Sequence, residues 1–205
     1  MNTSAPIDSA ERRPNPVVAC GIAPLAWWCL LWLFLLVPSV SRGLEADEIR
    51  EYQFKAGYLF NFARLIEWPT DSVPKTNSTI VIGLLEDDPA TATLQKALES
   101  KVANGHPLKV ILLPNARSLT NCQLFFFSRS AKIDAGEIIK QSKGASIVTV
   151  GEIENFARRG GTINLIRKSD DTLRFEVNLA AAEAANIKIS SKMAGMATIV
   201  RTDVP

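Results

Sequence analysis

The chain has 205 residues, of which 47% are hydrophobic and 21% are charged, and its formal net charge at pH 7 is +2. Lysine and arginine are scattered and do not alternate with aromatic residues along a stripe, so the charge pattern of a nucleic-acid-binding surface is missing. We see no internal repeat and no low-complexity tract, and this length favours one domain with its own core.

The first forty residues have the layout of an export signal. Arg12 and Arg13 precede an apolar run from Val17 to Val37, and the small residues Ser39 and Ser41 follow it. A basic stretch, an apolar stretch and small residues before the cut are typical of a secretory signal peptide.

We expect residues 1–41 to be a signal peptide that is cut near Ser41, with Ala46 as an alternative cut. The apolar run is also about as long as a membrane-spanning helix of roughly 20 residues, so an uncleaved signal anchor stays open. In both cases residues 42–205 would form a single domain outside the cytoplasm.

The stretch from Glu51 to Pro69 predicts the first helix of that domain. Apolar side chains recur at steps of three and four, which places them on one helical face. Pro69 lacks a backbone donor and disfavours a helical conformation at the preceding Trp68, so the helix should end near Glu67. The residues of the apolar face are Ile49, Tyr52, Ala56, Leu59, Phe62, Ala63 and Ile66.

Four continuous apolar runs follow, and they predict the central strands. They lack the alternation of a half-exposed strand, which indicates strands covered on both faces. With helices expected between them, the fold class is α/β: one domain with a mixed, mostly parallel sheet and helices on both faces. The runs are Ile80–Leu85, Leu108–Leu113, Leu124–Phe127 and Ile147–Val150, and the helices are Ala90–Leu98, Ile133–Ser142 and Ile153–Arg158.

The last third of the chain predicts a hairpin and a final helix. Thr162–Ile166 and Thr172–Val177 alternate in the manner of an antiparallel hairpin with one solvated face, which we place at an edge of the sheet. The segment Ile187–Val200 is rich in alanine and methionine, and we expect it to be a helix that packs on the first one.

Residues suited to catalysis or metal binding are scarce. His106 is the only histidine and lies in a turn before Pro107, where it is a poor base for a nucleophile. No closely spaced pair of histidines or cysteines forms a metal motif. The acidic Glu86-Asp87-Asp88 run is typical of a helix start, although its oxygens could also hold a hard cation. We therefore predict no catalytic residue, no metal site and no cofactor, and a protein that is not an enzyme.

Cys122 is the one cysteine outside the export segment. It precedes an apolar strand, which favours a buried thiol over one that pairs two chains.

Lys55 is the most unusual residue of the first helix, because it falls within the apolar face. One interpretation is that its stem is packed while the ammonium reaches water. The other is that it pairs with a buried carboxylate or backbone oxygens at a ligand pocket, since an unpaired buried charge costs several kcal/mol. Glu176 and Asn178 are the candidate partners.

Three other side chains of this region suggest a contact surface. Phe60 and Arg64 lie on the opposite arc of the helix, and Trp68 lies beyond its end. An exposed aromatic residue beside an arginine is typical of the centre of an interface. The alternative is that another element covers this side and that Phe60 belongs to the core.

A second group lies on the last predicted strand. Arg174, Glu176 and Asn178 share one face of that strand, which is either exposed to solvent or the floor of a pocket. We expect Glu176 to face solvent. Asn178 is placed at a pocket or, because a helix-forming segment follows it, at the N-cap of a helix.

The order of these segments resembles one family, the YfiR-like periplasmic proteins. The resemblance runs from about Glu51 to Ile199 and rests on the ordered set rather than on any single piece. It implies a repressor of a membrane diguanylate cyclase, a role in cyclic-di-GMP signalling and biofilm formation, and a homodimer. Members of the family carry disulfides, which the lone Cys122 cannot form within the chain. The quoted segments are KAGYLFNFARLIEWP, TIVIGLL, CQLFFF, IVTVG, NFARRGGTIN and RFEVNLA.

Three functions stay open. The first is a non-catalytic periplasmic regulator that binds the external domain of an inner-membrane diguanylate cyclase or sensor kinase. The second is a periplasmic module for a small aromatic or anionic ligand, with Lys55, Arg64, Trp68 and Arg174 in its pocket. The third is an exported hydrolase, which only the α/β class supports. We favour the first, with Phe60 and Asn178 added to its candidate binding residues.

Overall fold

The computed structural model describes residues 46–71 and 78–203, all of which belong to one compact unit, Leu44–Pro205. The predicted signal peptide and its cut near Ser41 lie outside the described residues. Within the described ranges, no helix is long and apolar enough to cross a membrane.

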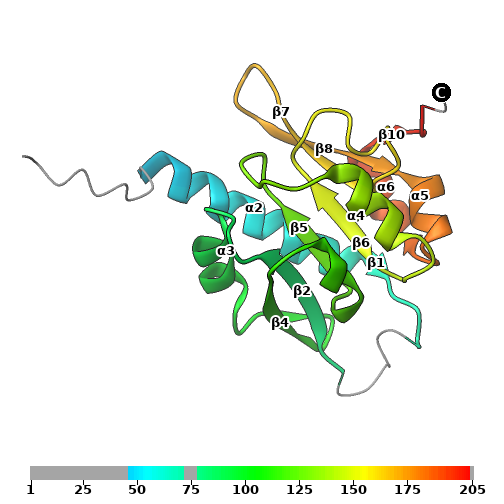
Figure 1. Ribbon diagram of the computed structural model, residues 1–205, viewed down its shortest axis with the longest axis horizontal. Helices are drawn as coiled ribbons and strands as arrows, with labels where there is room; N and C mark the ends of the chain where they lie inside the picture. The colour runs from blue at the N-terminus through cyan, green and yellow to red at the C-terminus, as the bar shows by residue number, and fades with distance from the viewer. Residues whose placement is uncertain (1–45, 72–77, 204–205) are drawn as a thin grey trace, which may run out of the picture. The chain divides into compact units, whose positions relative to one another are not determined.

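Helices are interspersed with single strands and with runs of two or three strands along the chain (Figure 1). The helices are α2 (Ala46–Leu65), α3 (Thr91–Leu98), the 3-10 helix η1 (Ala116–Asn121), α4 (Ala135–Ser142), α5 (Leu179–Ala184) and α6 (Ser191–Met196). The strands are β1 (Ile66–Glu67), β2 (Ile80–Leu85), β3 (Val102–Ala103), β4 (His106–Leu113), β5 (Leu124–Phe127), β6 (Val148–Gly151), β7 (Ile163–Arg167), β8 (Leu173–Asn178), β9 (Lys188–Ile189) and β10 (Thr198–Val200).

One sheet of eight strands organises the domain, in the order β10-β8-β7-β6-β5-β2-β4-β3. Neighbouring strands run parallel except at the pairs β7–β8 and β3–β4. The prediction of a mixed, mostly parallel sheet is confirmed. The β7–β8 hairpin lies one strand in from the edge, because β10 pairs with the outer side of β8.

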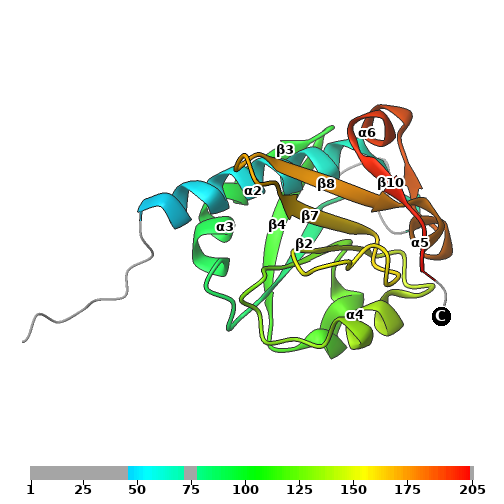
Figure 2. The same ribbon diagram turned by 90° about the horizontal axis from the view of Figure 1, so that it is seen from above.

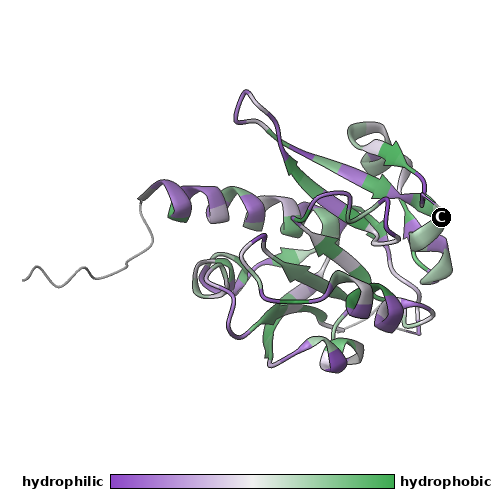
Figure 3. Cartoon of the chain, turned by 45° about the horizontal axis from the view of Figure 1, so that its top comes forward, coloured by the Kyte–Doolittle hydropathy of each residue, from purple (hydrophilic) through white to green (hydrophobic). Residues whose placement is uncertain are grey.

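Helices cover both faces of this sheet, as predicted (Figure 2). On one face α2 and α3 close a core with residues such as Ile82, Phe126 and Val177. On the other face η1 and α4 close a second core around Phe125 and Phe127. Because successive residues of a strand point to opposite faces, both must be apolar when both faces are covered. This explains the continuous apolar runs of the central strands, which contrast with the mixed surface of α2 (Figure 3).

The long helix α2 buries the face that the sequence predicts. Leu59 and Phe62 are almost fully buried, and the Phe62 ring lies 5.1 Å from that of Phe175 on β8. The helix ends at Leu65, and the Trp68 indole N–H folds back to donate to the carbonyl oxygen of Ala63 at 3.1 Å.

Two predicted helices are wrong. The segment Ile153–Arg158 is a run of turns, in which Asn155 has a φ of +58°, a left-handed conformation that interrupts a helix. The segment Ile187–Val200 is divided into β9, α6 and β10. Ser190 caps α6 there, since its hydroxyl accepts from the backbone N–H of Met193 at 3.3 Å. The expected packing against the first helix holds in part, because Met193 lies in the same core as α2.

Candidate partner- and ligand-binding site

Lys55 is the centre of a buried group of charges. Its side chain is only 1% exposed, and Nζ lies 2.6 Å from Oε1 of Glu51 and 2.7 Å from Oε1 of Glu152. The ammonium also lies 4.7 Å from the centre of the Tyr52 ring. The interpretation of Lys55 as reaching water is wrong, and pairing with carboxylates is confirmed. The partners are Glu51 and Glu152 rather than the expected Glu176 and Asn178.

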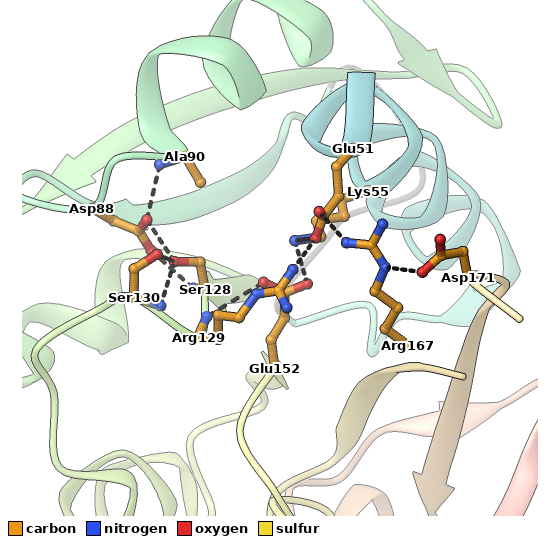
Figure 4. A network of polar contacts seen from close by, with 10 residues as sticks. All are labelled: Glu51, Lys55, Asp88, Ala90, Ser128, Arg129, Ser130, Glu152, Arg167 and Asp171. Atoms are coloured by element: carbon orange, nitrogen blue, oxygen red, sulfur yellow. Dashed lines mark hydrogen bonds and ion pairs between the residues drawn. The ribbon is translucent and has the colours of Figure 1, made fainter. Parts of the chain in front are cut away.

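The charges continue outward from Glu51 (Figure 4). Arg129 pairs with Oε1 of Glu51, and Arg167 donates to Oε2 of Glu51 at 2.7 Å. Arg167 also contacts Asp171 at 3.1 Å across the turn of the hairpin. This ion network joins α2 to the loops after β5 and β6 and to the β7–β8 hairpin, so it fixes the hairpin alongside the helix.

The pKa values of the two carboxylates around Lys55 are shifted in opposite directions. Burial raises the pKa of Glu152, and Lys55 offsets only part of this effect. Burial also acts to raise the pKa of Glu51, but Lys55, Arg129 and Arg167 together lower it. Glu51 therefore keeps its charge to lower pH than Glu152 does.

Asp88 holds the loop after β2 against the loop after β5. Its Oδ1 accepts from the Ala90 backbone N–H at 2.9 Å and from the Ser128 hydroxyl at 2.8 Å, and its Oδ2 accepts from the Ser128 N–H at 2.8 Å (Figure 4). The expected role in a helix start holds in part: Asp88 shapes the turn that leads into α3, whose N-cap is Ala90 and has no side-chain cap hydrogen bond. Within residues 46–71 and 78–203, no three metal-ligand side chains come together.

An open cavity lies between α2, β8 and α6. Its volume is about 670 Å³, and three cations, Arg64, Arg174 and Lys192, line it together with Tyr58 and Met196. No carboxylate is among its lining residues. We call it the cationic cavity. It brings together two predicted site residues, Arg64 and Arg174, from positions 110 residues apart (174 − 64).

The other predicted site residues lie elsewhere. Phe60 is half-buried against the main core, with Arg64 and Lys101 at 5.6 and 5.5 Å from its ring centre, so it combines the two interpretations. Trp68 lines a smaller hollow, of about 380 Å³, that also includes Arg64 and Lys192. Lys55 is enclosed by its ion pairs.

Asn178 and Glu176 have internal roles on β8. Asn178 is fully buried and caps α5, since its Oδ1 accepts from Ala181 N–H at 3.0 Å while Nδ2 donates to Ala157 O and Thr202 Oγ1. The N-cap interpretation is confirmed. The expectation that Glu176 faces solvent is wrong, because it is 7% exposed and pairs with Arg158 at 3.3 Å.

Lys192 and Tyr58 are two of the polar lining residues that sequence reasoning missed. Lys192 lay in a segment expected to be one continuous helix, where no pocket was foreseen. Tyr58 is half-buried and its hydroxyl donates to Leu173 O at 2.7 Å, which ties α2 to β8. The Ser190–Ser191 pair before Lys192 is a cap signal that could have indicated a short helix there.

Cys122 is buried as expected, and its thiol donates to Leu119 O at 3.2 Å. Burial raises its pKa to about 12. We expect the native thiol to resist alkylation by iodoacetamide at pH 8 and to react rapidly in urea, as followed by mass spectrometry, because the thiolate is the reactive form. Rapid labelling of the native protein, or a dimer that only reductant dissolves, would contradict this.

The geometry defines a class of protein before any comparison. The five parallel strands β2, β4, β5, β6 and β7 have the spatial order 2-1-3-4-5 of flavodoxin-like α/β domains. The domain presents a cationic cavity beside its first helix and, among the described residues, no cluster suited to metal chemistry.

Comparison with known families then identifies the chain. The sequence model of the YfiR/HmsC-like family matches residues 52–198, and the chain belongs to that family. Its members are known as periplasmic regulators in cyclic-di-GMP signalling. The predicted family assignment is confirmed.

Other comparisons add little. No curated protein matches the sequence. Among solved structures, the chain is similar to an ABC domain in complex with L-Trp from Streptococcus pneumonia, with 9% identity, a TM-score of 0.44 and coverage of 69% of this chain and 61% of that one. It is also similar to a conserved domain protein from Vibrio cholerae, with 13% identity, a TM-score of 0.46 and coverage of 72% and 59%. The chain thus spans about three fifths of the length of each.

Proposed function

We propose that this protein is a non-catalytic periplasmic regulator that binds the external domain of an inner-membrane diguanylate cyclase and represses it. The family membership carries this proposal, because the match covers all of α2 from Tyr52 onward and the whole sheet except part of β10. The binding face lies along α2 and includes the cationic cavity with Arg64, Arg174 and Lys192.

The arrangement of this face supports a protein partner. Its cations come from three elements that the core holds in fixed positions, and Phe62 and Met193 behind them are buried. Arginine beside tyrosine and methionine is enriched at the centres of protein interfaces. The absence of lining carboxylates favours an acidic patch on the partner.

Membrane capture tests the proposal. The tagged chain, expressed with its own N-terminal segment, is recovered with inner-membrane proteins, and cyclic-di-GMP synthesis from GTP is measured in the same membranes with and without it. We expect capture of a cyclase and reduced synthesis, and both effects should be lost with Arg64→Glu/Lys192→Glu. The control Lys96→Glu/Lys140→Glu makes the same change in charge on α3 and α4.

Two results would overturn the proposal. If no cyclase is captured, the proposed partner is wrong. If a cyclase is captured but cyclic-di-GMP synthesis is unchanged, the proposed repression is wrong. Equal loss in the control double variant would show that net charge, and not this face, determines capture.

The cationic cavity also favours a second candidate function, a sensor for a small aromatic anion. Tyr58 supplies an aromatic wall, and three cations would bind a carboxylate or phosphate. Calorimetric titration with benzoate, and with benzamide as the neutral control, tests it. Binding of benzoate alone, lost in Arg174→Ala, supports the sensor, while equal heats for both compounds or for neither count against it.

A further inference from the structure

A second groove lies on the N-terminal half of α2, on the side of the β7–β8 hairpin. Arg50, Phe54 and Tyr58 line it from the helix, and Leu173 and Arg174 line it from the hairpin and β8. Its volume is about 700 Å³. It shares Tyr58 and Arg174 with the cationic cavity, so the two hollows meet at these residues.

Phe54 is the exceptional side chain of this groove. It is 63% exposed, the largest exposed fraction among the large apolar side chains that the structure describes. Phe62 on the same helix is only 1% exposed. Unlike Phe62, Phe54 contributes little to the core because most of its surface faces solvent. An aromatic side chain next to arginine and tyrosine is the composition found where binding energy concentrates in interfaces.

The charged residues that line the groove with Phe54 differ in whether they already form ion pairs. Glu51 and Asp171 also line the groove, but both are already paired with Arg167, and Glu51 with Lys55 and Arg129 as well. Arg50 and Arg174 form no ion pair within residues 46–71 and 78–203. The one acidic lining residue without an ion pair there is Asp47, in the first turn of α2. Two guanidinium groups that form no ion pair therefore line the same groove as the exposed ring, although Arg174 also acts on the nearby Asp170 through space.

Two contacts join the walls of this groove. Arg167 of the hairpin pairs with Glu51, one helical turn before Lys55, and the Tyr58 hydroxyl donates to Leu173 O. Figure 4 shows Arg167 reaching from the hairpin to Glu51 on α2, while Asp171 points to Arg167. Walls that are already joined lose less conformational entropy when an extended segment binds between them.

From this geometry we propose that the α2–hairpin groove binds an acidic segment of the partner, in which an apolar side chain packs on Phe54 and Leu173 and flanking carboxylates pair with Arg50 and Arg174. The inference rests on the proposed regulatory function, since it names the part of the partner that is recognised. It adds Arg50 and Phe54 to the binding residues.

Site-specific photocrosslinking tests the inference. The photoreactive amino acid p-benzoylphenylalanine replaces Phe54 in the tagged full chain, or Gln53 as the matched control, which is exposed on the same turn and lines neither hollow. After irradiation in membranes, we expect position 54 alone to give a crosslink to an inner-membrane protein. The crosslinked peptide, sequenced by mass spectrometry, should contain aspartate or glutamate beside an apolar residue.

Charge and ring variants give a second readout. Capture should fall about tenfold with Phe54→Ala and with Arg50→Glu/Arg174→Glu, as expected for residues worth more than 1 kcal/mol in an interface. It should fall further as salt is raised. Gln53→Ala should leave capture unchanged.

The outcomes separate this inference from the proposed function. Capture that persists in both groove variants, or a crosslink from position 53 alone, overturns the groove while the regulatory function stands. A crosslink from position 54 to residues 1–45 of the same chain, or to a second copy, also overturns it. If wild type captures no membrane protein, the proposed function fails first.

Discussion

Replacing Lys55 with alanine should destabilise the protein by about 3–5 kcal/mol, the cost of removing one partner from a buried ion pair. The substitution leaves Glu152, whose side chain is 6% exposed, without its cation. It also removes one of the three cations that contact Glu51. Urea unfolding measures the effect, and Trp68, the only tryptophan after the export segment, reports it by fluorescence.

Two further variants distinguish the ion pair from the packing of the lysine stem. Lys55→Met keeps most of the stem and should still be strongly destabilised, while Lys55→Met/Glu152→Gln should recover part of the loss because no buried charge is left unpaired. Lys188→Ala breaks the exposed pair with Glu67 and should change stability by less than about 1 kcal/mol. Additive losses in the double variant would show that Lys55 and Glu152 do not stabilise each other.

Phe62→Ala should cost about 3–5 kcal/mol of stability, the usual range for a buried phenylalanine. The Phe62 ring is 1% exposed and lies 5.1 Å from the ring of Phe175 and 6.0 Å from that of Tyr58. Its removal leaves empty space between α2 and β8. The neighbouring side chains cannot fill this space unless the helix moves. The midpoint of urea unfolding should therefore fall sharply with little change in slope.

Phe54→Ala is the matched control, since it removes the same side chain from the same helix at an exposed position. Its stability should stay within about 0.5 kcal/mol of wild type. Equal losses for both variants would mean that α2 is packed differently from the structure described above. A normal stability for Phe54→Ala also ensures that any loss of partner capture reflects binding.

The fold class could be predicted because both faces of the sheet are covered. A strand covered on both faces needs apolar residues at consecutive positions, as in Leu124–Phe127. Such a continuous apolar run is visible in the sequence. The end of the chain was harder, because β9, α6 and β10 are two, six and three residues long. Elements so short are held by neighbours such as β1 and β8, and these contacts leave no periodic pattern.

In the candidate site, too, some features could be predicted from the sequence and others depend on tertiary contacts. Lys55 stood out because a charge lay on an apolar face, and Glu51 is its neighbour four residues earlier on the helix. Glu152 is 97 residues away in sequence (152 − 55), and only the parallel pairing of β5 and β6 brings its loop to α2. Arg174 was predicted from its strand, whereas Lys192 became visible only once α6 was placed.

The place of β10 in the sheet has a consequence for biogenesis. This strand, residues 198–200, pairs with the outer side of β8 and follows every other described strand in chain order. If the protein crosses the membrane from its amino terminus, β8 emerges before the strand that covers its outer edge. That edge would then be exposed to chaperones and proteases until β10 pairs with it.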